Sequence, residues 1–314
     1  MPTVLVLGGT GFIGRNFVEY FASLQEWEIT ATHFTRTPWN HDIAKWIKVD
    51  LRKEEEVARA ISNFDVVIQA AATTSGINDG IKRPDLHMTD NVIMNALILR
   101  RVNQVSIKNF VFFSCTTMLR STEVPQSETD FNPSDEMYPA YFGVGWTKVY
   151  IEKLCEFYSR QNGNSTKFHV IRHSNVYGPY DKFDLEKSHV FGASITKVME
   201  ADDHVTIWGT GKERRDLIFV YDLIKLVDLA IKRQSLNFSI FNCGGDFISI
   251  ADLVKKIIEA SGRTHLEVRY DTSKPTVSFE TTLDCSYASE NLGWHQSISL
   301  DEGIRRTLDF WKAK

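Results

Sequence analysis

Short apolar runs alternate with longer amphipathic segments through the first half of the chain. The apolar runs, rich in β-branched and aromatic residues, predict strands at Thr3–Leu7, Glu28–Thr32, Trp46–Val49, Val66–Ala70, Phe110–Phe113 and Phe168–Arg172. Segments with apolar residues at three- and four-residue spacing predict helices at Ile13–Leu24, Glu54–Ile61, Asp90–Val105 and Lys148–Arg160. Because crossovers between parallel strands are right-handed, this alternation predicts an α/β fold with a doubly wound parallel sheet.

The second half of the chain has a less regular pattern. Loops are expected around Tyr177–Lys187, and helices near Ser188–Glu200, Asp222–Ile231, Ile250–Ala260 and Leu300–Trp311. We therefore expect a nucleotide-binding domain over residues 1–172 and a smaller mixed α/β C-terminal substrate lobe over residues 173–314. Part of that second half, about residues 212–245, is expected to return to the first domain. The two parts should share a cleft, where a ligand is expected.

Composition excludes several classes of protein. With 43% hydrophobic and 24% charged residues among 314, the chain has the balance of a globular protein rather than a disordered one. Its net charge of −4 argues against a nucleic-acid partner. The four cysteines form no C-x-x-C pair, so neither a metal site nor a disulfide scaffold is expected. The apolar start Val4–Leu7 is too short for an export signal or a membrane span, which favours the cytoplasm.

A glycine-rich turn follows the first predicted strand and begins the first predicted helix. Gly8 permits the tight turn, Gly11 lets the backbone approach a pyrophosphate, and Gly14 lets helix and strand pack closely. The alternative is a glycine-rich turn that binds nothing, but the placement between strand and helix favours a Rossmann dinucleotide site. The residues assigned to this turn are Gly8, Thr10, Gly11, Phe12, Ile13 and Gly14.

The sequence leaves the choice between NAD and NADP open. A carboxylate at the end of the second strand would hold the ribose of NAD, and none is present there. His33 can hydrogen-bond a free ribose, whereas Arg36 can meet the 2′-phosphate of NADP. Asp50 and Leu51, after the third strand, are placed to touch an adenine edge, and a helix-capping role for Asp50 is the alternative.

Several further motifs resemble a known family. They are Ala70-Ala71-Ala72 leading to Gly76, Asn91, Asn175-Val176-Tyr177-Gly178-Pro179-Tyr180-Asp181-Lys182-Phe183, Ser188-His189-Val190 and Trp208–Asp216. With the glycine turn, they resemble the extended short-chain dehydrogenase/reductase family, most closely its GDP-L-fucose synthase branch. The chain also resembles the GDP-heptose C4 dehydrogenases of capsule biosynthesis, which implies NAD as the cofactor.

The resemblance implies a Tyr-x-x-x-Lys pair and a Ser or Thr that act on a sugar hydroxyl. Lys148 matches the lysine, whereas Val144 stands where the tyrosine belongs. Cys115 stands at the Ser/Thr position, so Thr116 or Thr117 is expected to supply the hydroxyl, with Cys115 more often a packing residue than a thiolate.

Two further catalytic assignments depend on the same resemblance. The Cys and His that carry out epimerisation in the fucose synthases correspond to Thr117 and His189, and a threonine is a poor base. Epimerisation is therefore not expected. Tyr141, His189 or a bound water are the candidates to replace the missing tyrosine.

The resemblance also implies the ligand contacts. Ala70 and Ala71 belong to the cofactor site with Lys148, and the expected substrate-binding residues are Gly76, Asn175, His189, Lys197 and Arg215. The chain is thus interpreted as an NAD(P)-dependent oxidoreductase acting at C4 of a GDP-linked hexose or heptose in surface-polysaccharide biosynthesis. A catalytically impaired scaffold or sensor and a GDP-sugar epimerase-reductase are the alternatives. By resemblance, the helices Asp90–Val105 and Lys148–Arg160 form a homo-oligomer contact.

Overall fold

A seven-stranded parallel sheet forms the larger part of the protein in the computed structural model, which describes residues 1–73, 84–161, 163–185, 188–233, 235–274 and 276–314. The strand order is β10-β6-β5-β4-β1-β2-β3, and every neighbouring pair is parallel. The predicted doubly wound sheet is confirmed. The strands are β1 (Thr3–Leu7), β2 (Glu28–His33), β3 (Lys45–Lys48), β4 (Phe64–Gln69), β5 (Ile107–Cys115), β6 (Lys167–His173) and β10 (Phe238–Cys243).

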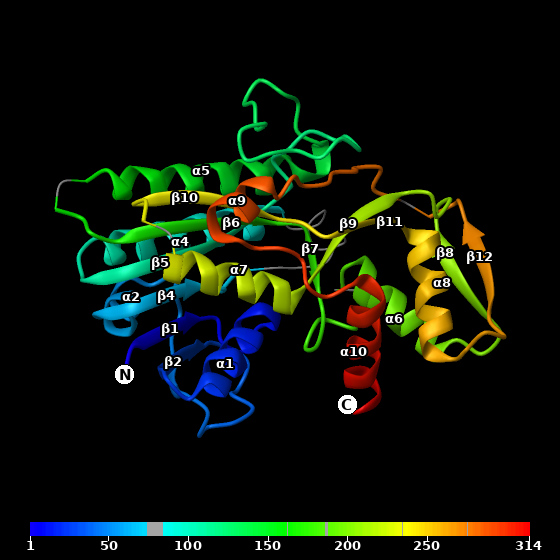
Figure 1. The fold of residues 1–314 in the computed structure, drawn as a ribbon, viewed down its shortest axis with the longest axis horizontal. Coiled ribbons are helices and arrows are strands. Elements are labelled where there is room, and N and C mark those ends of the chain that lie inside the picture. The colour runs from blue at the N-terminus through cyan, green and yellow to red at the C-terminus, as the bar shows by residue number, and fades with distance from the viewer. Residues whose placement is uncertain (74–83, 162, 186–187, 234, 275) are drawn as a thin grey trace.

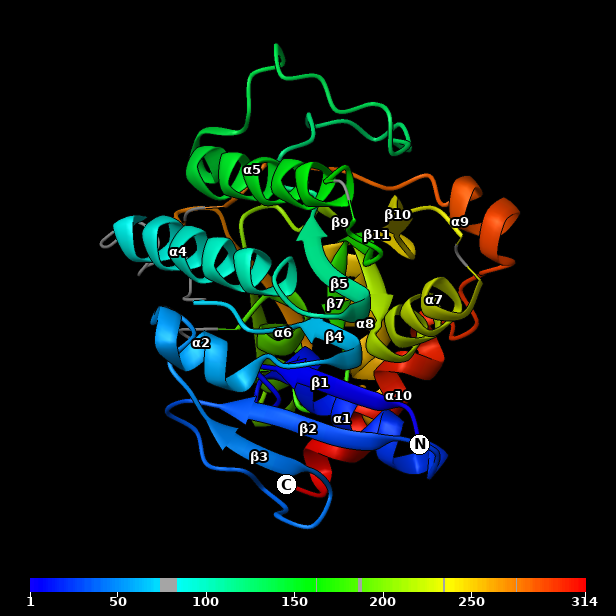
Figure 2. The same cartoon turned by 90° about the vertical axis from the view of Figure 1, so that its left-hand side faces the viewer.

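Helices cover both faces of this sheet, which explains why the inner strand β1 carries apolar residues on both faces. Along β1, Val4 and Val6 join one buried cluster while Leu5 and Leu7 join the other. On the first face lie α1 (Phe12–Leu24), α7 (Val220–Arg233) and α9 (Ser286–Leu292), and on the second lie α2 (Glu54–Ala60), α4 (Pro84–Val102) and α5 (Phe142–Ser159). Figure 2 shows α4 and α5 running side by side over the second face.

A smaller lobe lies at one end of the long axis of the molecule, on the right in Figure 1. It contains a three-stranded sheet, β11-β9-β7, and a two-stranded sheet of β12 and β8. Its core packs apolar residues of three helices against these strands. The elements are β7 (Asn175–Tyr177), α6 (Val190–Glu200), β8 (His204–Trp208), β9 (Arg214–Phe219), β11 (Asp246–Ser249), α8 (Ile250–Ser261), β12 (Glu267–Asp271) and α10 (Leu300–Lys312).

The chain passes between the two parts more than once. After β9 in the smaller sheet, α7 packs on α1 and β10 pairs with β6, so residues 220–243 lie in the larger part. The helix α9 also packs there, with Ala288, Leu292 and Trp294 buried beside α7. The boundary between the two domains at residue 172 remains a prediction. The sequence pattern did not suggest that the segment around α9 also lies in the larger part.

Other differences between prediction and structure concern the ends of elements. The helix expected at Lys148 begins six residues earlier, at Phe142, after a single 3-10 turn (η1, Pro139–Tyr141). The proline at the first position of that turn needs no N–H donor, so it begins the turn without loss. No helix in the described ranges is both long and apolar enough to cross a bilayer.

Candidate active site

The glycine turn brings the end of β1, the start of α1 and the segment after β4 into close contact. Gly8 has φ +76°, and a Cβ at this residue would lie 2.6 Å from Ala71 Cα. A Cβ on Gly14 would collide with the carbonyl oxygen of Gly8. The turn is closed by a hydrogen bond from the N–H of Gly11 to that carbonyl, 2.9 Å. No side chain larger than hydrogen therefore fits at Gly8 or Gly14 without moving the backbone.

The amino end of α1 suits a diphosphate. Gly11 is its N-cap and provides no side-chain cap, and the first turn holds no acidic residue. Unpaired N–H groups and the positive end of the helix dipole therefore face the turn. Because the turn leaves room beside Gly11, this region fits the pyrophosphate of a dinucleotide.

At the end of β2, the structure places His33 where a ribose-binding carboxylate would be expected. Its Nδ1 lies 3.1 Å from the carbonyl oxygen of Arg36, and its ring contacts Trp46 edge to face. The Arg36 side chain is exposed. The residue before His33, Thr32, contacts the glycine turn, because its Oγ1 accepts a hydrogen bond from the Gly8 N–H.

Asp50 does not cap a helix, so the capping alternative is wrong. The helix α2 has Lys53 as its N-cap, whereas the Asp50 carboxylate receives both Arg52 Nε (2.9 Å) and Nη2 (3.0 Å). These hydrogen bonds lower the pKa of Asp50. Leu51 is buried in the core with α2 and α4. The contact of this pair with an adenine edge stays a prediction.

The segment after β4 lies against the glycine turn as the resemblance implies. The N–H of Ala70 donates to the carbonyl of Leu7, 3.1 Å, and Ala71 packs on Gly8. Asn91, on α4, donates to the carbonyl of Thr73 and accepts from its N–H, both at 3.0 Å. Gly76, expected to bind substrate, lies outside the described residues.

Val144 and Lys148 lie one helical turn apart on α5, beside the carboxyl end of β5. Lys148 Nζ donates to the carbonyl of Phe113 at 2.7 Å and lies 4.8 Å from the centre of the Phe112 ring. Desolvation lowers the pKa of Lys148. Gly145 permits the close packing, because a Cβ there would lie 3.0 Å from the carbonyl oxygen of Thr117.

Three polar residues follow one another where β5 ends. Cys115 Sγ lies 3.1 Å from Thr117 Oγ1, and both side chains are half-buried. Thr116 is buried, with 8% of its surface exposed. Of the two threonines proposed to supply a hydroxyl, Thr117 is therefore the more accessible.

His173 is a site residue that the sequence reasoning missed. It ends β6 directly opposite Cys115 of β5, and its Nδ1 lies 2.7 Å from the carbonyl oxygen of Ser174. Burial is the main cause that lowers the pKa of His173 to about 4; the hydrogen bond to Ser174 raises it, and the nearby Lys148 and His189 lower it. Its position at the end of a predicted strand, next to the strand carrying Cys115, was the available signal.

Tyr141 ends the 3-10 turn before α5 and lies near both Arg215 and Cys115. Its role as a replacement for the missing tyrosine stays a prediction. Its ring packs edge to face on Phe279 and contacts Tyr138. Burial raises the pKa of Tyr141, and the nearby Arg215 opposes that increase. The Arg215 guanidinium donates to the carbonyls of Arg214 (2.7 Å), Phe279 (3.1 Å) and Val277 (2.7 Å).

The remaining substrate candidates lie in the smaller lobe. Asn175 Nδ2 donates to the carbonyl of Asp216 (2.9 Å), and Lys197 Nζ donates to that of Thr206 (3.0 Å) below the Trp208 ring. His189 is the N-cap of α6 and makes no capping hydrogen bond through its side chain. Desolvation lowers the pKa of His189, and Lys182 lowers it further.

The first turns of α1 connect the glycine turn to this lobe, a contact that the sequence did not suggest. The Arg15 guanidinium lies between the rings of Trp39 and Tyr180, 4.3 and 3.7 Å from their centres. Asn16 Nδ2 donates to the carbonyl of Pro179 at 3.0 Å. The loop that leads to His189 is therefore held against the dinucleotide-binding helix.

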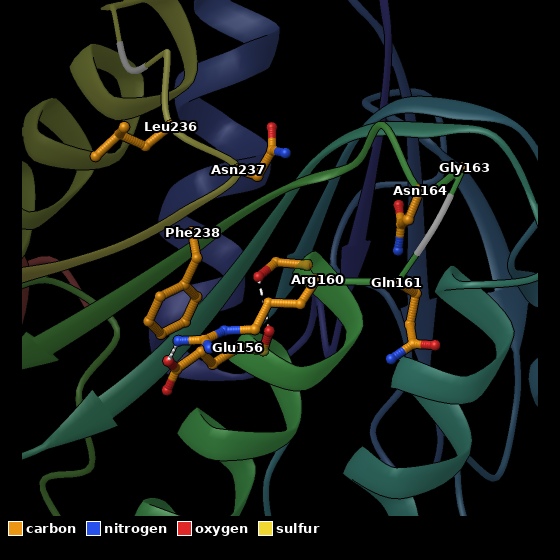
Figure 3. Close-up of a pocket in the computed structure, with 9 residues that line it drawn as sticks. Glu156, Arg160, Gln161, Gly163, Asn164, Leu236, Asn237 and Phe238 are labelled. Carbon is orange, nitrogen blue, oxygen red and sulfur yellow. Dashed lines mark hydrogen bonds and ion pairs between the residues drawn. The ribbon is translucent and has the colours of Figure 1, made fainter.

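A surface hollow at the opposite edge of the sheet does not belong to this site. Figure 3 shows its lining, which comes from the end of α5, the following loop and the start of β10. Its two charged residues, Glu156 and Arg160, pair with each other. The described residues contain no cluster of three His, Cys, Asp or Glu side chains suited to a metal ion.

Comparison with known proteins gives similarity over nearly the whole chain. A family model described as "NAD dependent epimerase/dehydratase family" matches residues 4–244. A GDP-L-fucose synthase of Azorhizobium caulinodans is 30% identical, covering 98% of this chain and 96% of that protein. A GDP-L-colitose synthase of Yersinia pseudotuberculosis is 25% identical, covering 98% and 97%. The crystal structure of a UDP-glucose 4-epimerase from Thermotoga maritima with UDP-glucose has a TM-score of 0.85 at 25% identity, covering 99% of both chains.

Proposed function

Because the chain belongs to the NAD dependent epimerase/dehydratase family, we propose that it is an NAD-dependent dehydrogenase of a GDP-linked hexose or heptose, acting at C4. The family match and the relatives confirm the resemblance inferred from the motifs. The observation that carries the proposal is the position of Lys148, whose hydrogen bond to the carbonyl of Phe113 holds its ammonium at the end of β5, near Cys115 and at the edge of the sheet where the glycine turn lies.

The residues of the turn are those that would hold the dinucleotide. Gly8 and Gly14 let the turn pack closely on Ala71 and on its own backbone, Gly11 lets a diphosphate approach the backbone, and the amino end of α1 provides N–H donors. His33 suits a free ribose hydroxyl, which agrees with NAD, while the exposed Arg36 keeps NADP as an outcome to be tested. When bound, the nicotinamide supplies a hydride acceptor for an alcohol.

Cations in the smaller lobe favour a substrate with a diphosphate. Three of the five N–H groups of Arg215 are used by backbone carbonyls, which leaves two for a ligand. Lys197 uses one donor on Thr206 and keeps the others. Neither the Arg215 guanidinium nor the Lys197 ammonium pairs with a carboxylate among the described residues. Both groups therefore remain available to an anion.

The proton chemistry must be done by residues other than a tyrosine at position 144. A valine has no proton to exchange, whereas the Thr117 hydroxyl can hold the substrate oxygen. The Lys148 ammonium stabilises negative charge that develops on that oxygen. Because Thr117 replaces a cysteine at the epimerising position, we propose oxidation without epimerisation.

The remaining parts of the proposal concern the oligomeric state, the biosynthetic pathway and the cellular location. Exposed apolar residues lie on α5 and α4: Phe142, Tyr150 and Phe157, with Ile93 beside them. We propose that this face packs against a second copy of the chain. A role in surface-polysaccharide biosynthesis and a cytoplasmic location belong to the same proposal.

One experiment tests cofactor and reaction together. The purified protein is denatured, released nucleotide is identified by mass, and the native protein is mixed with GDP-hexoses and GDP-heptoses while absorbance at 340 nm is followed. We expect bound NAD or NADH and an absorbance change that depends on the sugar. Bound nucleotide with no absorbance change for any sugar contradicts the dehydrogenase and favours a cofactor-binding scaffold or sensor, to which Val144 also points.

A further inference from the structure

The tautomer of His173 is fixed by its surroundings. A backbone carbonyl can only accept a hydrogen bond, so the 2.7 Å contact between Nδ1 and the carbonyl of Ser174 requires a proton on Nδ1. In a neutral imidazole the lone pair then lies on Nε2. None of the hydrogen bonds in the described part of the chain involves that atom, and the side chain is half-buried rather than sealed.

His173 also lies where the reacting hydroxyl is expected. It pairs in register with Cys115, so both side chains emerge on the same face of the sheet at the carboxyl ends of β5 and β6. Its ring centre is 6.3 Å from that of Phe113, whose carbonyl holds Lys148. The charged or titratable groups around it are Lys148 from α5, Cys115 from β5 and His189 before α6.

We propose that His173 Nε2 is the proton acceptor that replaces the missing tyrosine. This inference rests on the proposed function. Oxidation of a secondary alcohol removes a hydride from carbon and a proton from oxygen; the hydride goes to the nicotinamide dinucleotide, the proton goes to His173 Nε2, and the C–O single bond becomes a carbonyl. The ring is neutral at pH 7 because burial and Lys148 keep its pKa low, so the lone pair on Nε2 is free to accept the proton. A ring of low pKa holds that proton weakly and releases it to water.

His189 is the other histidine near the site that could accept the proton. It lies nearby and its pKa is also lowered, but no hydrogen bond in the described contacts fixes either of its ring nitrogens. Its tautomer is therefore free to vary, whereas that of His173 is not. A proton acceptor needs its lone pair held in one direction, which favours His173.

The test compares His173→Gln with the matched variant His189→Gln in single-turnover reduction of the retained nucleotide. We expect His173→Gln to keep its nucleotide and melting temperature and to lose about 10²–10⁴-fold in rate, as for removal of a general base. His189→Gln, at an expected substrate-binding residue, should raise the sugar concentration needed for half the maximal rate, while its rate at saturating sugar should fall by less than about tenfold because the general base is kept. If His173→Gln reacts within threefold of the unchanged protein, the inference is wrong.

A rescue separates proton transfer from packing. Adding Val144→Tyr to His173→Gln restores a proton acceptor on α5, and we expect it to recover at least tenfold of the lost rate. No recovery, together with loss of nucleotide from His173→Gln, would assign His173 to cofactor packing instead. If His173→Gln fails to fold, His173→Ala with added imidazole replaces it, and absence of rescue by imidazole counts against the inference.

A readout without substrate distinguishes failure of this inference from failure of the proposed function. In ¹⁵N-labelled protein, two-bond ¹H–¹⁵N correlation spectra report which ring nitrogen carries the proton. We expect the Nδ1–H form of His173 at pH 7, assigned by its loss in His173→Gln. An Nε2–H form or an imidazolium overturns the inference even if the protein oxidises a GDP-sugar, whereas an Nδ1–H form without sugar oxidation rejects the proposed function alone.

Discussion

Lys148 Nζ donates a hydrogen bond of 2.7 Å to the carbonyl oxygen of Phe113, which ties the middle of α5 to the end of β5. The contact directs the ammonium toward the strand ends, where the glycine turn also lies. Val144 lies one turn earlier on the same helix. In the proposed reaction this lysine binds the nucleotide and stabilises charge on the substrate oxygen, and another residue exchanges the proton.

Removing this ammonium should weaken both nucleotide retention and turnover. For Lys148→Met we expect a rate at least about 10²-fold lower, because charge on the substrate oxygen is no longer stabilised. Mass analysis of released nucleotide and the 340 nm assay measure the two effects. Lys153→Met is the matched control on the same helix, since Lys153 is exposed and pairs only with Glu156. An equal loss in both variants would contradict a specific role for Lys148.

The glycine turn should tolerate no side chain at Gly8. Gly8→Ala adds a collision with Ala71 to the cost of a positive φ, so bound nucleotide should be lost. Gly262 has the same φ of +76° but open space around its Cβ position, so Gly262→Ala isolates the backbone strain, about 1–2 kcal/mol. We expect Gly262→Ala to keep its nucleotide while the melting temperature falls. Nucleotide retained by Gly8→Ala would show that the turn is not the binding site.

The buried ion pair between Arg172 and Glu152 should be important for stability. Its two hydrogen bonds are 2.7 and 3.0 Å long, and both side chains are 5% exposed. Glu152→Gln leaves a buried guanidinium without its counter-charge, which should cost about 3–5 kcal/mol in the free energy of unfolding. Urea denaturation measures it. Glu267→Gln, in the exposed pair with Arg269, should give no measurable change.

Asp181 should make stability fall as pH rises. Burial raises its pKa from 3.8 to about 7, and Oδ2 has no hydrogen-bond partner in the structure while Oδ1 accepts from the N–H of Lys182. Between those two values the unfolded chain is ionised and the folded chain still holds the proton, so ionisation opposes folding increasingly from pH 4 to pH 7.

The variant Asp181→Asn removes this pH dependence. We expect Asp181→Asn to be more stable than the unchanged protein at pH 8. The difference should be about 4 kcal/mol at most, because each unit of pKa shift corresponds to about 1.4 kcal/mol. At pH 4 the two proteins should be equally stable. Denaturation by urea at the two pH values measures the difference. A lower stability of Asp181→Asn at pH 8 would mean that the carboxylate is stabilising.

A charge on the exposed face of α5 should separate the proposed oligomer. Phe157, 54% exposed, would face the second copy, so Phe157→Glu places an unpaired carboxylate in an apolar contact. Light scattering after size-exclusion chromatography should show a smaller mass than for the unchanged protein. Tyr270→Glu, at an exposed residue of β12 in the smaller lobe, is the control and should leave the mass unchanged. A monomeric unchanged protein would reject the oligomer.

The sequence by itself determined six of the seven strands of the large sheet, all except β10, and the location of the glycine turn. Apolar runs such as Thr3–Leu7 predict strands because a strand buried on both faces needs no polar positions, and glycine at residues 8, 11 and 14 reports contacts that a Cβ would prevent. The motifs around Asn175 and His189 likewise identified the family without coordinates.

Only the tertiary structure decided which distant residues share the site. The sequence could not place His173 opposite Cys115, because strand register depends on packing between segments 58 residues apart. Nor could it show that the Asp50 carboxylate is hydrogen-bonded to Arg52, or that Tyr141 lies near both Arg215 and Cys115. The short strands β7 to β12 also went unpredicted, since their hydrogen bonds and burial come from partners far along the chain.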